Sequence, residues 1–482
     1  MTERLKPALS VGSLTAAVAL LAGMGVASAQ APAPAASPLS GAGSFPRSFI
    51  VPGTNTSLHV GGQVQIDANY SFDAFGAAST GAFDNLSPGS VSVEGPGAPA
   101  NGFHSMHGVL RFTADNSKLF TETRTPTAYG ELKTYIEFDF NGGVTTNTNT
   151  SGGSSATKIG DDGVPRLRQA YGTLGPLLFG KAISNFADLA ALADTLDGPV
   201  EAGQYMGAGT FRQTQIRYTY LLPNGLSLAA SIESAFSAGE ISGTTTGGAL
   251  ATWNDFNAPG ITQRVPAFTA KALIQQPWGH NQVGIAVMQE RFDNSAFAGF
   301  DGFSQTGIPH GTHFKRWGYM LQESGHLNTF GRDRVTWALG YGQGAAQYSW
   351  PLASPDLGLN WEEGLICSPT NGTSPATATA FTCSQPRVWG INAGYDHFWN
   401  AQWRSGIGLG WDQVSKPNAA ATWGPTGLAS LEHRHYSAGV SLFWTPVADV
   451  QFGSTFVWYH REVWSGARGN AERLETQALF RF

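Results

Sequence analysis

Hydrophobic and polar residues alternate along much of the chain with a period of two. Between Ser57 and Tyr70, the apolar set is Leu58, Val60, Gly62, Val64, Ile66, Ala68 and Tyr70, and the polar set is His59, Gln63, Gln65, Asp67 and Asn69. The last residues, Glu472–Phe482, alternate in the same way. Because successive side chains of a strand point to opposite faces, this pattern predicts strands with one apolar and one polar face.

Such alternation recurs in about 16 segments, an even number as in bacterial outer-membrane barrels. The segments between the first and the last cover residues 106–113, 131–140, 166–173, 177–181, 215–220, 226–232, 268–274, 283–287, 317–321, 335–341, 389–395, 403–411, 436–444 and 450–458. A single strand of this kind also suits the edge of a soluble sandwich. Many in succession, several of them bounded by Trp or Tyr, favour strands that meet lipid on one face.

The predicted connections alternate between short and long. Short turns rich in Gly, Pro and Asn lie near residues 174–176, 223–225, 277–279, 330–332, 400 and 445–446. Long polar loops cover about 71–104, 141–165, 182–209, 234–266, 292–312, 342–386, 412–432 and 461–471. The turn at 115–130 is longer than this scheme expects. The prediction is an all-β, transmembrane antiparallel barrel of about 16 strands with short periplasmic turns and long external loops.

The N-terminal residues predict export. Arg4 and Lys6 precede an apolar run over residues 11–26, and Ala27-Ser28-Ala29 forms a small-x-small cleavage site. Residues 1–29 are therefore predicted to be a signal peptide. Residues 30–56 form a Pro/Ala-rich periplasmic leader, and residues 57–482 form the barrel. No later stretch has the ~18 uninterrupted apolar residues of a spanning helix.

Composition agrees with this class. Charged residues make up 13% of the 482 residues, against about 25% in average soluble proteins. The chain also has 61 glycines and 12% aromatic residues. Low charge, abundant glycine and many aromatics suit strands that face lipid on one side and water on the other. The net charge of −6 gives no indication of a nucleic-acid partner.

Several segments resemble the DcaP-like porins. They are residues 49–62 (FIVPGTNTSLHVGG), 129–140 (YGELKTYIEFDF), 166–172 (RLRQAYG), 178–181 (LFGK), 193–197 (ADTLD) and 211–218, together with the terminal Phe482. The resemblance covers most of the predicted barrel and is most specific in its first half. It implies a homotrimeric, 16-stranded porin that passes small solutes and prefers organic anions such as di- and tricarboxylates. It also implies contact with outer-membrane lipids and lipopolysaccharide.

The resemblance further suggests that the loop at about 182–209 folds into the lumen as a constriction. Its acidic residues are Asp188, Asp194, Asp197 and Glu201. Basic residues predicted to face the lumen are Arg111, Arg166, Arg168, Arg217, Lys271 and Arg404. Acids opposite an arginine row would create a transverse field that sets ion selectivity. Alternatively, these are solvated charges of the barrel wall. Because Asp67, Glu131, Glu137 and Asp139 are also predicted to point inward, a cation-preferring or neutral pore remains an alternative.

The remaining candidates carry less chemistry. Cys367 and Cys383 are the only cysteines, and in an exported chain they are predicted to form a disulfide. The pairs His433/His435 and His310/His313 provide only half a metal site each, so no metal or cofactor is expected. No catalytic set stands out, which argues against a barrel enzyme. The inward positions are small, polar or charged and about 16 strands leave an aqueous lumen, which argues against a sealed structural or adhesive barrel. A non-selective or sugar-preferring porin remains an alternative.

Overall fold

The chain divides into two compact units, Met1–Gly41 and Ala42–Phe482. All but the last residue of the first unit lies outside the residues that the computed structural model describes. The described residues are 41–72, 91–98, 108–142, 164–196, 212–235, 240–244, 250–253, 265–293, 313–349, 353–354, 361–362, 364–369, 381–421, 423–429 and 431–482.

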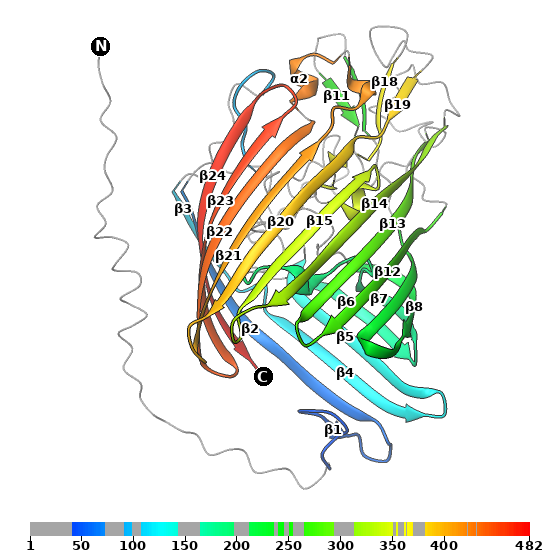
Figure 1. The fold of residues 1–482 in the computed structure, drawn as a ribbon, viewed down its shortest axis with the longest axis vertical. Helices are drawn as coiled ribbons and strands as arrows, with labels where there is room; N and C mark the ends of the chain where they lie inside the picture. The colour runs from blue at the N-terminus through cyan, green and yellow to red at the C-terminus, as the bar shows by residue number, and fades with distance from the viewer. Residues whose placement is uncertain are drawn as a thin grey trace, which may run out of the picture. The chain divides into compact units, whose positions relative to one another are not determined.

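In the second unit, antiparallel strands close into a barrel (Figure 1). Strand β2 (Ser57–Ser71) pairs with β24 (Arg468–Arg481) on one side, and on the other with both β3 (Val109–Thr113) and β4 (Lys118–Thr127). If β3 and β4 count as one interrupted strand and the short β1 (Phe49–Ile50) is left out, the described residues form a ring of 16 strands. The predicted fold class is confirmed.

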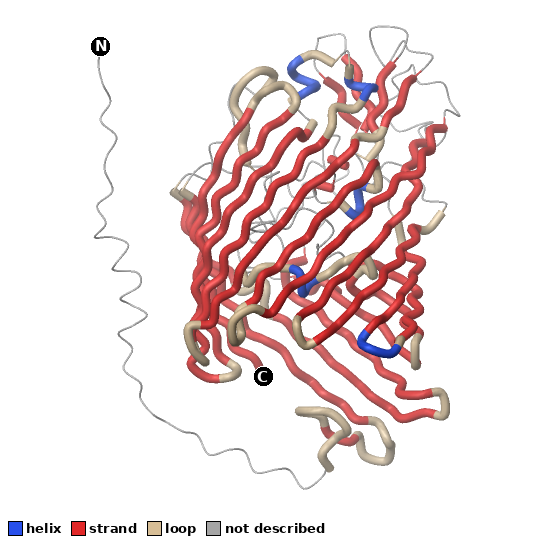
Figure 2. The backbone as a smooth tube through the Cα atoms, viewed as in Figure 1, coloured by secondary structure: helices blue, strands red, loops and turns tan. Residues whose placement is uncertain are grey.

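The other barrel strands are β5 (Gly130–Gly142), β6 (Val164–Leu174), β7 (Leu177–Ile183), β8 (Arg212–Leu221), β9 (Leu226–Glu233), β12 (Ala267–Gln276), β13 (Gly279–Asp293), β14 (His313–Asn328), β15 (Arg334–Gln343), β20 (Arg387–Phe398), β21 (Trp403–Val414), β22 (Glu432–Val447) and β23 (Val450–Val463). Figure 2 shows helices only as isolated turns: η2 (Leu189–Ala191), η3 (Pro223–Gly225), η5 (Ala346–Tyr348), η7 (Asn418–Ala420) and α2 (Pro425–Leu428). In the described part of the chain, no helix is long and apolar enough to cross a membrane.

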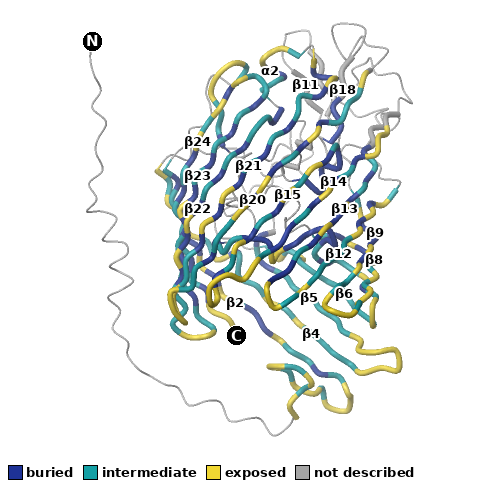
Figure 3. The backbone as a smooth tube through the Cα atoms, in the orientation of Figure 1, coloured by how far each residue is buried: buried dark blue, intermediate teal, exposed yellow. Residues whose placement is uncertain are grey.

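Burial along the strands is inverted relative to a soluble protein (Figure 3). On β2, Val60 and Ile66 are 55% and 46% exposed, whereas Gln65 and Asp67 are 4% and 2% exposed. The apolar phase therefore faces outward and the polar phase faces the lumen. An outward apolar face is stable where it meets lipid instead of water. The closed ring also pairs every strand edge, as a structure within a lipid bilayer requires.

The predicted turn at 115–130 is wrong. The second barrel strand resumes as β4 after a four-residue interruption at 114–117, where the chain folds into a tight turn. The Ser117 hydroxyl accepts from the backbone N–H of Gln65 (3.0 Å) and donates to its carbonyl (3.2 Å). A side chain thus replaces the missing ladder bonds, so turn-forming residues lie inside a strand without ending it.

Three connections at the long-loop end also differ from the prediction. The loop expected at 461–471 shortens to the four residues between β23 and β24. The loops expected at 234–266 and 342–386 contain strands of their own, which pair in a separate four-stranded sheet. Its strands are β10 (Glu240–Thr244), β11 (Leu250–Trp253), β18 (Ile366–Pro369) and β19 (Phe381–Ser384). A two-stranded ladder joins β16 (Ala353–Ser354) to β17 (Trp361–Glu362).

At the short-turn end, the segment before β2 packs on the barrel. Strand β1 pairs with the start of β2. Nη2 of Arg47 donates to both carboxylate oxygens of Asp449 (2.7 and 2.8 Å) in the turn between β22 and β23. The Arg124 guanidinium lies 4.4 Å above the ring of Phe45. Part of the predicted leader therefore lies against the barrel at this end.

Candidate functional site: the barrel lumen

The segment Ser184–Leu196, called the lumen segment, follows β7 and binds inward-facing side chains of the barrel. Its first residues bind Glu233 at the end of β9. The Glu233 carboxylate accepts from the Ser184 hydroxyl (2.7 Å) and from the Asn185 backbone N–H (2.8 Å). The Asn185 amide also donates to Thr269 on β12 (3.1 Å). These three contacts within two residues fix where the segment leaves the wall.

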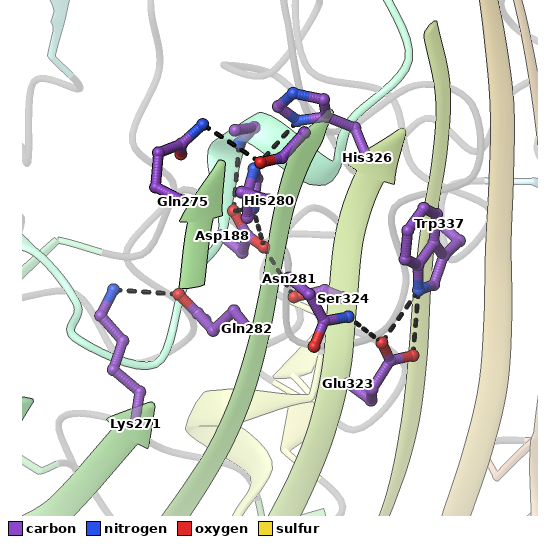
Figure 4. A network of polar contacts seen from close by, with 12 residues as sticks. Asp188, Lys271, Gln275, His280, Asn281, Gln282, Glu323, Ser324, His326 and Trp337 are labelled. Carbon is purple, nitrogen blue, oxygen red and sulfur yellow. Dashed lines mark hydrogen bonds and ion pairs between the residues drawn. The ribbon is translucent and has the colours of Figure 1, made fainter. Parts of the chain in front are cut away.

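Asp188 holds the middle of the lumen segment (Figure 4). Its carboxylate oxygens lie 2.8 and 3.0 Å from Nε2 of His280 on β13, and Oδ2 accepts from the Ser324 hydroxyl on β14 (2.7 Å). Nδ1 of His280 lies 2.9 Å from Nδ1 of His326. Burial raises the pKa of Asp188, but the hydrogen bonds from His280 and Ser324 outweigh burial and hold the pKa below its usual value.

The end of the lumen segment reaches the opposite strands. The Asp194 backbone N–H donates to Asp396 on β20 (2.8 Å), and the Asp194 carboxylate pairs with Arg404 on β21. The Leu196 N–H donates to Thr455 on β23 (3.1 Å). Contacts from β9 round to β23 require the segment to pass inside the barrel.

Glycines on three strands allow this close approach. A Cβ at Gly394 of β20 would lie 2.5 Å from the Cβ of Ala193, and one at Gly453 of β23 would lie 2.7 Å from a methyl group of Leu196. At Gly406 of β21, it would collide with the Asp194 carbonyl. Glycine inside a strand thus marks where another backbone passes close by.

Two of the predicted basic residues share one carboxylate. Arg166 donates through Nε and Nη2 to the two oxygens of Asp139 on β5 (3.0 and 2.7 Å). Nη1 of Arg168 lies 3.2 Å from the same carboxylate. Asp139 is fully buried. A bulge between β5 and β6 shifts the register here, and both arginines turn toward Asp139.

The other predicted basic residues are distributed over four strands. Lys271 donates to the uncharged amide of Gln282 (3.0 Å), and in the described residues neither it nor Arg217 forms an ion pair. Besides pairing with Asp194, Arg404 lies over the ring of Phe443 at 4.2 Å. Arg111 is exposed opposite Asn69 in the β2–β3 ladder.

The described loop acids do not contact the arginines of β6 and β8. Asp188 binds His280 and Asp194 binds Arg404, whereas Asp197 and Glu201 lie outside the described residues. Glu233 is a site residue that the sequence interpretation missed. The signal was present, since Ala229, Ser231 and Glu233 continue the inward phase of β9, one residue beyond the predicted end of that strand.

The histidine and cysteine pairs lie toward the long-loop end. His435 is buried between Asp412 (2.9 Å) and Glu432 (3.0 Å), and His433 stacks on Trp464 with centroids 4.0 Å apart. Within the described ranges, no group of three or more His, Cys, Asp or Glu side chains could hold a metal ion. His310 lies outside these ranges. Cys383 is disulfide-bonded, and Cys367 faces it across the β18–β19 ladder.

A closed 16-strand barrel with an apolar outer wall, a polar lumen and an internal segment defines a porin-type channel of the bacterial outer membrane. The family model described as "Porin subfamily" matches residues 41–478, so the chain belongs to the porin subfamily.

Solved structures agree with this fold. The outer membrane channel DcaP of Acinetobacter baumannii is 19% identical, with 89% of this chain and 97% of that chain covered and a TM-score of 0.61. An anion-selective porin from Comamonas acidovorans is 8% identical over 89% and 100% of the two chains, with a TM-score of 0.48. No curated protein matches the chain.

Proposed function

We propose that this porin prefers organic anions such as di- and tricarboxylates among the small hydrophilic solutes that pass through it. The observation that supports this preference is the distribution of partners in the lumen. Asp194 forms an ion pair with Arg404, and the Asp188 carboxylate is held by His280 and by the Ser324 hydroxyl, so neither loop acid is free to bind a passing cation.

The basic residues predicted to face the lumen outnumber the carboxylates that form ion pairs with them. Arg166 and Arg168 share the single carboxylate of Asp139, which leaves one positive charge in excess within that group. Arg217 and Lys271 add two more cations further round the ring, on β8 and β12, near the carboxylate of Glu233. Guanidinium groups bind carboxylates through two parallel hydrogen bonds. A row of them provides successive weak sites for a solute with two or three carboxylates, as conduction requires.

One observation favours a second candidate, a sugar-preferring porin. Phe120, Tyr135 and Tyr171 form a row on the inward faces of β4, β5 and β6, with neighbouring ring centroids 5.6 and 5.5 Å apart. Aromatic rings combine a broad apolar face with, in tyrosine, a polar edge. Such a row suits the apolar face of a sugar ring as it slides along the wall.

The test is to replace Arg166, Arg168 and Arg217 together by Ser. Reversal potentials in a salt gradient should shift toward cations, and dicarboxylate uptake into proteoliposomes should slow. Arg47→Ser is the matched control, because this arginine pairs with Asp449 at the short-turn end. A cation-selective wild type, or a triple variant unchanged in both measurements, would refute the preference. Faster uptake of neutral sugars than of dicarboxylates would favour the second candidate.

A further inference from the structure

One patch of the lumen wall is apolar although its residues occupy the inward phase. Ala286 and Met288 on β13, Met320 on β14 and Val388 on β20 are all fully buried. In a water-filled lumen, such side chains are stable only where other protein covers them. The covering residues therefore belong to the interior of the barrel.

The segment Gly344–Ser349, called the inner loop, supplies this cover. It follows β15, and Gly344 and Ala345 turn the chain through positive φ angles of 61° and 51°. Ala345, Ala346 and Tyr348 belong to the same buried cluster as the apolar patch. The sequence predicts these residues to lie in the long external loop at about 342–386. The apolar patch that they cover became visible only in the structure.

Three polar contacts hold the inner loop from two sides. The Ala346 N–H donates to Glu290 on β13 (3.1 Å), and the Gln347 amide donates to the Ser234 carbonyl (3.0 Å). The Tyr348 hydroxyl donates to Oε2 of Glu233 (3.0 Å). The partners lie on β13 and at the end of β9, so the loop is fixed in position as well as covered.

Glu233 also connects the inner loop to the lumen segment. The carboxylate that accepts from Tyr348 also accepts from Ser184 and from the Asn185 N–H. The ring of Tyr348 meets that of Phe186 edge to face, with centroids 5.6 Å apart. The two internal segments, which residues 197–343 separate in the sequence, thus meet at one buried carboxylate and one aromatic contact.

We propose that the inner loop is a second constriction of the pore, and that Glu233 is the residue that positions both constrictions. The inference rests on the channel function and is independent of the sign of its ion selectivity. A carboxylate suits this role because it only accepts hydrogen bonds and has about four acceptor sites. Ser231 (2.7 Å) and Thr269 (3.3 Å) hold its Oε1 from the wall.

The test uses the full-length protein in planar bilayers. Tyr348→Phe removes one hydroxyl and keeps the ring, so the apolar cluster stays filled. A hydrogen bond to a charged group is strong enough that its loss should raise the time spent in a wider conductance level about tenfold. Glu233→Gln should act in the same direction, because its amide offers only one acceptor oxygen to the donors around it. Neutral polymers of graded size should then enter at a larger cut-off.

The matched control is Tyr395→Phe, which removes the same kind of bond, from a tyrosine hydroxyl to the Asp333 carboxylate (2.7 Å), at a short turn. It should leave conductance and size cut-off unchanged. Unaltered conductance levels and cut-off in both Tyr348→Phe and Tyr348→Ala would overturn the inference. So would failure of Tyr348→Phe to assemble, because the bond would then serve barrel folding. A cation-selective wild type would refute only the anion preference.

Discussion

Removing the Asp188 carboxylate should release the middle of the lumen segment without unfolding the barrel. Three donors converge on it: His280, the Ser324 hydroxyl and the Ala190 N–H (3.2 Å). A hydrogen bond to a charged group contributes about 1.5–3 kcal/mol, so losing one raises the population of the released state by about one to two powers of ten. The anchors at Glu233 and Thr455 remain in place.

Asp188→Ala should therefore raise single-channel conductance and current noise, while Asp188→Asn, which keeps an acceptor for Ser324, should do so less. The pH dependence has a defined sign. Because the pKa of Asp188 is lowered on folding, its contribution is complete above the usual carboxyl pKa of about 4 and is lost as pH falls through the lowered value.

The wild-type channel at low pH should thus approach the behaviour of Asp188→Ala at neutral pH. Planar bilayer recordings at both pH values measure this directly. Equal conductance and noise in wild type and Asp188→Ala at neutral pH, with both proteins assembled, would refute the view that Asp188 holds the constriction.

Three further predictions concern other parts of the molecule. The pKa of Asp333 is lowered to about 2 by hydrogen bonds from the Phe398 N–H, His397 and Tyr395. The turn between β14 and β15 should therefore stay protected in amide exchange until the pH falls toward that value. Asp333→Asn should remove this protection at neutral pH. Denatured, unreduced protein should show no reactive thiol, because Cys383 is disulfide-bonded; two labelled thiols per chain would contradict the pairing of Cys367 with Cys383. Unboiled protein should migrate as a trimer and give a trimer mass in native mass spectrometry, since barrels that share an apolar wall shield it together; a monomer in both would reject the trimer.

The alternation of residues was sufficient to predict the barrel. Val60, Val64 and Ile66 are outward and Gln65 and Asp67 inward, as the period of two requires. This succeeds because the side-chain direction of a strand is a local property that each residue pair repeats. The prediction failed at 114–117, where the Ser117 hydroxyl keeps an interrupted strand in the sheet. Strand periodicity does not reveal that a side chain can replace backbone hydrogen bonds in this way.

The sequence by itself therefore determined the class of protein and the two faces of the wall. Only the tertiary structure decided which loops enter the barrel and which charges remain available to a solute. Asp194 pairs with Arg404, and Leu196 binds Thr455, 259 residues away. Loops have no periodicity to mark their direction, and their partners lie on strands that only the closed ring brings within reach.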